Sequence, residues 1–167
     1  MRTSRTIRVL STSAAAVLAI TAFSVAPAFA DGARSGGHSV LRAELIGSMP
    51  APASPAIAGI NPGGAPWANG PSQVRVRADG RITVEIRGLV IPPPRGTGVN
   101  PVASVVATLV CDQRVDASTM PFALSAAGTG STRDVISLPR HCDDPTVLIQ
   151  PAANRSVYIA STVARDD

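Results

Sequence analysis

The sequence predicts an all-β fold, an antiparallel β-sandwich or flattened barrel of about eight short strands with one disulfide. Three observations predict it. Apolar and polar residues alternate in short runs with the period of two that is typical of half-buried strands. Turn-forming Gly and Pro residues separate these runs, and no stretch of the mature chain shows a convincing amphipathic helical period.

The N-terminus has the three parts of a secretory signal peptide. A head with three arginines at 1–8 precedes an apolar, small-residue run at 9–25, and Ala28-Phe29-Ala30 provides the small residues that signal peptidase requires. A membrane anchor is the alternative, but Ser and Thr interrupt the run, which ends before Pro27. We therefore predict a Sec signal cleaved after Ala30, a secreted protein and no membrane anchor.

Cleavage changes the size and the charge of the chain. Removing 30 of the 167 residues leaves 137, enough for one domain, and removing three arginines lowers the net charge from +4 to +1. Nucleic acid is therefore not an expected partner. We expect a disordered leader at 31–37, then a single β-domain at 38–167 with a long Pro/Gly loop at 50–72. Because the chain contains no lysine, Schiff-base and phosphate-loop lysine chemistry are excluded.

The clearest element is a hairpin at 73–90, where the alternation continues on both sides of Asp79-Gly80. A two-residue loop would mix apolar and polar residues on each face, which disfavours that register. A three-residue loop at 78–80, ending in a left-handed Gly80 bulge, places all apolar residues on one face. The predicted opposite pairs are Arg77 with Arg81, Val76 with Ile82, and Val74 with Val84.

Other runs predict the remaining strands. A first strand is expected at 40–46, and the very apolar run at 102–111 predicts a central strand buried on both faces. Trp67, within the long loop, is interpreted as a hydrophobic pin that holds the loop to the sheet, with a ligand platform as the alternative. Shorter strands are expected at 119–124, 132–138, 146–150 and 156–162.

Cys111 and Cys142 are the two cysteines of the chain, and an exported protein meets an oxidising compartment. We predict a disulfide between them, which would tie the end of the central strand to the loop at 140–144. In the chain-entropy model, closing a loop of this length stabilises the fold by roughly 3–4 kcal/mol. A redox or metal-binding pair is the alternative, but it more often shows Cys-x-x-Cys spacing.

Two stretches resemble known proteins. The segment 43–50, the glycine–proline loop and the segment 76–89, which ends in Gly-Leu, resemble the opening half of chordin-repeat (CHRD-type) domains, which are extracellular β-domains. The His-x-His pair expected after Gly-Leu is missing, and Ile91-Pro-Pro-Pro94 stands there. The segment 136–149 resembles small uncharacterised secreted proteins of GC-rich bacteria. Neither resemblance implies an activity, a cofactor or a set of site residues.

The outer face of the hairpin is the first candidate site. Guanidinium groups suit bidentate contacts with phosphate or carboxylate, so this face could bind an anionic cell-surface polymer. Another extracellular protein is a further possible partner. The sequence favours a second interpretation, in which the charges guard a solvated sheet edge against aggregation. The candidate ligand-binding residues are Arg75, Arg77, Arg81 and Arg87.

The second candidate is a metal site at His141, Asp143 and Asp144, beside Cys142, with His38 or Asp134 as a further ligand. Turn formation by Asp-Asp-Pro is the alternative. No Gly-x-Ser-x-Gly elbow marks a nucleophile. We therefore expect a secreted, non-catalytic β-sandwich protein with a binding or structural role, and no cofactor. The alternative function is a small extracellular hydrolase or metal-binding protein that uses His141 and Asp143.

Overall fold

The computed structural model describes residues 38–162. Within this range the chain forms strands and connections without any helix, and so without a helix that could cross a membrane. The strands are β1 (Ser39–Gly47), β2 (Asn61–Pro62), β3 (Gln73–Arg77), β4 (Arg81–Ile86), β5 (Ser104–Cys111), β6 (Arg114–Ser118), β7 (Phe122–Ala123), β8 (Gly130–Val135), β9 (Thr146–Pro151), β10 (Val157–Tyr158) and β11 (Ala160–Thr162).

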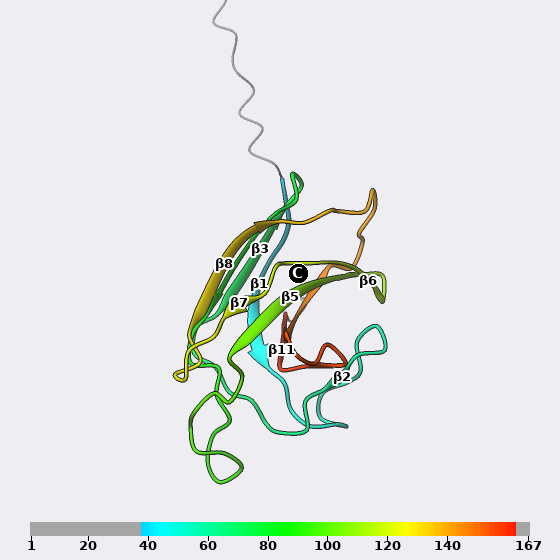
Figure 1. Cartoon of the computed structure of the whole chain (residues 1–167). Coiled ribbons are helices and arrows are strands. Elements are labelled where there is room, and N and C mark those ends of the chain that lie inside the picture. Colours follow the sequence, from blue (N-terminus) through cyan, green and yellow to red (C-terminus); the bar gives the residue numbers. More distant parts are fainter. Residues whose placement is uncertain (1–37, 163–167) are drawn as a thin grey trace, which may run out of the picture. The chain divides into compact units, whose positions relative to one another are not determined.

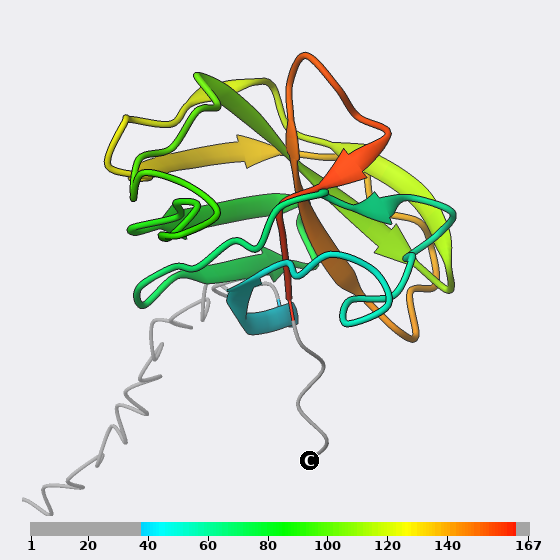
Figure 2. The same ribbon diagram turned by 90° about the horizontal axis from the view of Figure 1, so that it is seen from below.

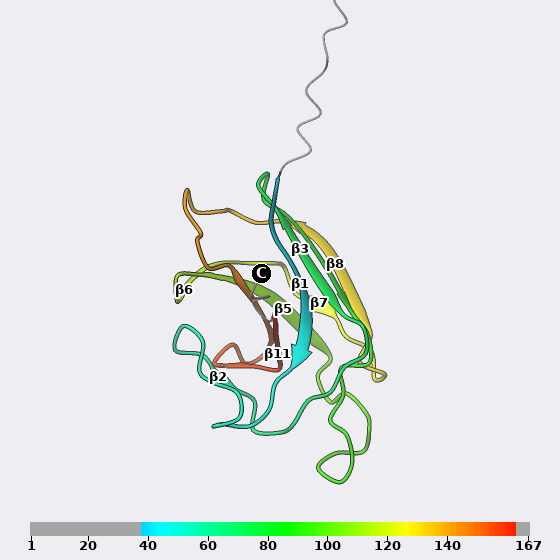
Figure 3. The same cartoon turned by 180° about the vertical axis from the view of Figure 1, so that it is seen from behind.

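Nearly all of these strands belong to one curled antiparallel sheet. Its order is β6-β5-β9-β11-β1-β3-β4-β8, and β7 pairs with the first residues of β5. A separate two-stranded parallel pair joins β2 to β10. In Figures 1 and 3, β3 and β8 lie on one side of β1, and β5 and β11 lie on the other. The predicted fold class, an antiparallel sandwich or flattened barrel with one disulfide, is confirmed.

The curl divides the sheet into two halves that face each other. We call β1, β3, β4 and β8 the hairpin half, and β5, β6, β7, β9 and β11 the cystine half. Strand β1 connects the two halves, because residues 39–44 pair with β3 while Leu45, Ile46 and Gly47 pair with β11. In Figure 2 the strands of the hairpin half lie roughly side by side, and β5 and β9 cross them at an angle.

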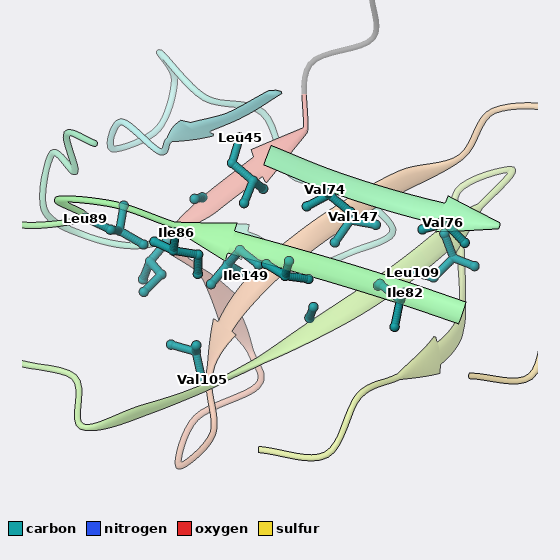
Figure 4. Packing of buried hydrophobic residues seen from close by; sticks show 14 of the residues in the cluster. Leu45, Val74, Val76, Ile82, Ile86, Leu89, Val105, Leu109, Val147 and Ile149 are labelled. Atoms are coloured by element: carbon teal, nitrogen blue, oxygen red, sulfur yellow. The ribbon is translucent and has the colours of Figure 1, made fainter. Parts of the chain in front are cut away.

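The main core fills the space between the halves, where apolar side chains from both inner faces meet (Figure 4). Burying such faces is the dominant favourable term in folding. The hairpin half contributes Leu45, Val74, Val76, Ile82, Val84 and Ile86, and the cystine half contributes Val105, Ala107, Leu109, Val147 and Ile149. Trp67 is only 7% exposed and belongs to this core, which confirms its interpretation as a pin for the loop.

The hairpin has the predicted register. Val76 lies opposite Ile82 and Val74 opposite Val84, and Gly80 N–H donates to the Arg77 carbonyl at 3.0 Å. Gly80 has φ +83°, and a Cβ there would lie 2.4 Å from the Ile136 carbonyl oxygen. Any other residue would therefore be strained and would collide with the chain that follows β8. The bulged three-residue turn is confirmed.

In the cystine half, strands β5 and β9 are buried on the outer face as well as on the inner one. Residues 105–111 of β5 are all buried, which confirms the prediction of a central strand. On the outer face, Val110 and Leu148 form a second cluster with Tyr158, against which Ile57, Ala58 and Ile60 of the long loop pack. The Tyr158 hydroxyl donates to the Pro55 carbonyl at 2.7 Å. The segment 50–62 is therefore a cover held by apolar contacts and a hydrogen bond.

Several boundaries differ from the sequence predictions. Strand β6 was not predicted: it follows a tight turn in which Asp112 and Gln113 have φ of +51° and +59°. The strand expected at 119–124 shortens to β7, and the one expected at 156–162 divides into β10 and β11. The strand expected at 132–138 begins and ends earlier, as β8. Long-range pairing overrides the local pattern in each case.

Candidate arginine-lined binding face

The outer face of the hairpin half contains an ordered row of basic side chains. Cross-strand register places Arg42 of β1 opposite Arg75 of β3, Arg75 opposite Thr83 of β4, and Thr83 opposite Arg133 of β8. We call Arg42, Arg75 and Arg133 the arginine row. All three side chains are exposed, because alternate residues of a strand point away from the core. Thr83 lies in the row between two of them.

Of the three row residues, Arg75 lies on a strand that is paired on both sides. Strand β3 is hydrogen-bonded to both β1 and β4, and β4 to both β3 and β8. The hairpin arginines therefore do not guard an unpaired strand, and the edge-protection interpretation is wrong for Arg75, Arg77 and Arg81. Strand β8 ends the sheet, and within the described residues the stretch 39–44 of β1 pairs with β3 alone, so that interpretation applies to Arg133 and Arg42.

The surface is hollowed along the row. A depression of about 320 Å³ is lined by side chains from all four strands of the hairpin half. Within residues 38–162, no carboxylate oxygen lies within 4.0 Å of a guanidinium nitrogen of the row. The lining residues are Arg42, Gln73, Arg75, Thr83, Glu85 and Arg133.

The four predicted arginines are not equivalent. Arg75 lies in the row itself, whereas Arg77 is half-buried at the end of β3. Arg81 pairs with Asp79 at 3.3 Å across the turn, an exposed contact that contributes little to stability. Arg87 lies just past β4, where it lines a neighbouring hollow of about 590 Å³. We call these four together with Arg42 and Arg133 the arginine face.

Sequence reasoning did not assign Arg42 and Arg133 to the candidate site. The alternation in 40–46 already placed Arg42 on the polar side of a strand, but nothing local indicates which strands become neighbours. Arg42 is 33 residues from Arg75 and Arg133 is 58 residues from it along the chain. The partner order of β1, β3, β4 and β8 is what brings them together.

The second candidate cluster is not brought together. His141, Asp143 and Asp144 are all exposed in the connection from β8 to β9, and within 38–162 no three His, Cys, Asp or Glu side chains are grouped to hold a metal ion. Asp134, offered as a fourth ligand, instead accepts hydrogen bonds from the backbone N–H groups of Met120 and Val135, both at 2.8 Å. The backbone carbonyl of His38 accepts a hydrogen bond from the backbone N–H of Ala78.

The disulfide between Cys111 and Cys142 is formed, as predicted, and it is consistent with an oxidising compartment outside the cytosol. The predicted signal peptide at 1–30 and leader at 31–37 lie outside the described residues. Comparison of the chain with protein families, curated proteins and solved structures finds no match.

Proposed function

We propose that this chain is a secreted, non-catalytic β-domain that binds an anionic cell-surface polymer through the arginine face. The observation that carries the proposal is the arginine row. Arg42 and Arg75 lie directly opposite each other on paired strands, where like charges destabilise a sheet. An anionic ligand would relieve this repulsion, and guanidinium groups bind phosphate, sulfate or carboxylate by paired hydrogen bonds.

The arrangement of the two halves supports the same function. The disulfide and the covered outer face stabilise the cystine half, and no segment within residues 38–162 covers the polar face of the hairpin half. Sites built on strands are held more precisely than sites on loops. A row that crosses four strands can contact several charges of one extended polymer, so that weak single contacts add up.

The test is retention of the secreted chain on heparin and teichoic-acid columns. The triple variant R42A/R75A/R133A should elute at clearly lower salt than the wild type, because each removed arginine removes one screened charge contact. The matched control is R95A/R114A/R155A, which removes the same charge from exposed arginines outside the face. Its elution should stay close to that of the wild type.

Two results would overturn the proposal. One is retention that survives alanine substitution of all six arginines of the face. The other is an equal loss of retention in the control variant, because binding would then follow net charge rather than the row. Circular dichroism of each variant separates lost binding from lost folding.

A further inference from the structure

The row of residues next to the arginine row carries the opposite charge. Register places Glu44 opposite Gln73, Gln73 opposite Glu85, and Glu85 opposite Ser131. These residues lie two positions from the arginine row along each strand, so the two rows are about 7 Å apart. The outer face of the hairpin half is therefore bipolar, with three guanidinium groups beside two carboxylates.

The hollow on the arginine face spans both rows. It is lined by all three arginines of the row and by Glu85 and Gln73 of the neighbouring one. Gln73 Nε2 donates to Glu85 Oε2 at 3.1 Å, which orients the carboxylate. Within the described residues no arginine nitrogen lies within 4.0 Å of Glu85, so this carboxylate does not serve to neutralise the row.

A purely anionic ligand does not match this hollow. An anionic group on the arginine row would be attracted there, but a second anion one row away would be repelled by Glu85. A ligand that carries an ammonium group beside its anion would satisfy both rows. The donors of the row come from three different strands, so they suit successive phosphate groups of one chain, each of which offers more acceptor oxygens than a planar carboxylate does.

We infer that the polymer bound by the arginine face is a polyphosphodiester that carries ammonium groups, with phosphate on Arg42, Arg75 and Arg133 and ammonium on Glu85. This inference rests on the proposed function and specifies the class of its ligand. Aminoacyl esters of poly(glycerol phosphate) have this chemistry, because each ester places a primary ammonium beside the phosphodiester chain.

The experiment compares two probes that differ only in the ammonium. Calorimetry would measure binding of the secreted chain to poly(glycerol phosphate) and to its D-alanyl ester, at about pH 6, where the α-amino group is protonated. We expect the alanylated polymer to bind about tenfold more tightly, in line with one added charge-assisted contact. The E85Q variant should lose this preference and bind the plain polymer more tightly than the wild type does.

The matched control is D112N, which removes one negative charge from the exposed β5–β6 turn, where Asn tolerates the positive φ of 51°. It should keep the tenfold preference. Equal or tighter binding of the plain polymer by the wild type would overturn the inference and leave the proposed function standing. If the secreted chain binds neither polymer, both the inference and the proposed function are overturned. Binding to phosphatidylethanolamine vesicles but not to the polymers would overturn the assignment to a polymer.

Discussion

The two halves of this sheet differ in whether other parts of the described chain cover their outer faces. In the cystine half, Val110 and Leu148 are buried beneath the loop at 50–62, and the polar Thr108 and Gln150 hydrogen-bond each other. In the hairpin half, no segment within residues 38–162 covers the outer face, and the three guanidinium groups of the arginine row form no salt bridge there. Where a sheet is covered, its polar groups pair internally, and where it is open, they remain available to a ligand.

The largest expected effect concerns the disulfide, which joins β5 of the cystine half to the connection from β8 to β9. The double variant C111A/C142A should lose about 3–4 kcal/mol of unfolding free energy, because the unfolded chain regains the freedom of the opened loop. Urea denaturation measures this loss. The wild type kept reduced should have the same unfolding free energy as the variant. A loss below about 1 kcal/mol would show that the connection from β8 to β9 is held in place without the cystine.

The next effect tests whether the two outer faces differ in their contribution to stability. Leu148→Ala should cost about 3 kcal/mol, because it opens a cavity beneath the cover of the cystine half. Arg75→Ala, on the open face, should change stability by less than about 0.5 kcal/mol. Equal losses in urea denaturation would contradict the distinction between a covered and an open face.

A smaller effect should appear at alkaline pH. Burial raises the pKa of Tyr158, and the hydrogen bond with Ser54 lowers it by less. Because the folded-state pKa lies above the unfolded value near 10, this stabilising contribution is complete below about pH 10 and is lost as pH rises through the folded-state pKa. Tyr158 is the single tyrosine, so tyrosinate absorbance reports it directly.

The absorbance midpoint should therefore lie above that of the denatured chain. In Y158F the corresponding fall in stability at alkaline pH should be absent. A midpoint at the unfolded value would mean that the loop at 50–62 opens freely and exposes the hydroxyl.

The smallest expected effect is on the stability of the arginine row. The triple variant R42A/R75A/R133A should unfold at the same urea concentration as the wild type or slightly higher, by a few tenths of a kcal/mol, because repulsion between Arg42 and Arg75 is removed. If the same variant also loses polymer retention, its unchanged stability would show that the row contributes to binding and not to folding. A clear loss of stability would contradict that distinction.

Local chemistry was sufficient to predict part of this fold. The register of β3 and β4 follows from alternation and from the conformational freedom of Gly80, and both are properties of neighbouring residues. The buried central strand follows in the same way from an unbroken apolar run. These features could be predicted because a shift of one residue would expose a complete apolar face.

Features that depend on partners distant in sequence could not be predicted. Strand β6 follows a turn made by Asp112-Gln113, which lacks the Asn-Gly or Asp-Gly pair that usually marks such a hairpin. The position of β1 beside β3, which completes the arginine row, depends on how β1 divides its pairing between β3 and β11. Neither the turn at 112–113 nor the divided pairing of β1 produces a recognisable pattern in the neighbouring sequence.

The cystine also determines how the chain would respond to a trypsin-like protease outside the cell. With no lysine, such an enzyme can cut only at arginine, and Arg140 is exposed two residues before Cys142. Residues 111 and 142 lie on opposite sides of that cut, so the two fragments would remain covalently joined and would separate only on reducing electrophoresis. Cutting there would therefore leave β9, with β11 beside it, joined through the cystine to β5, the strand that β9 pairs with, and the support of the arginine face would stay in one piece.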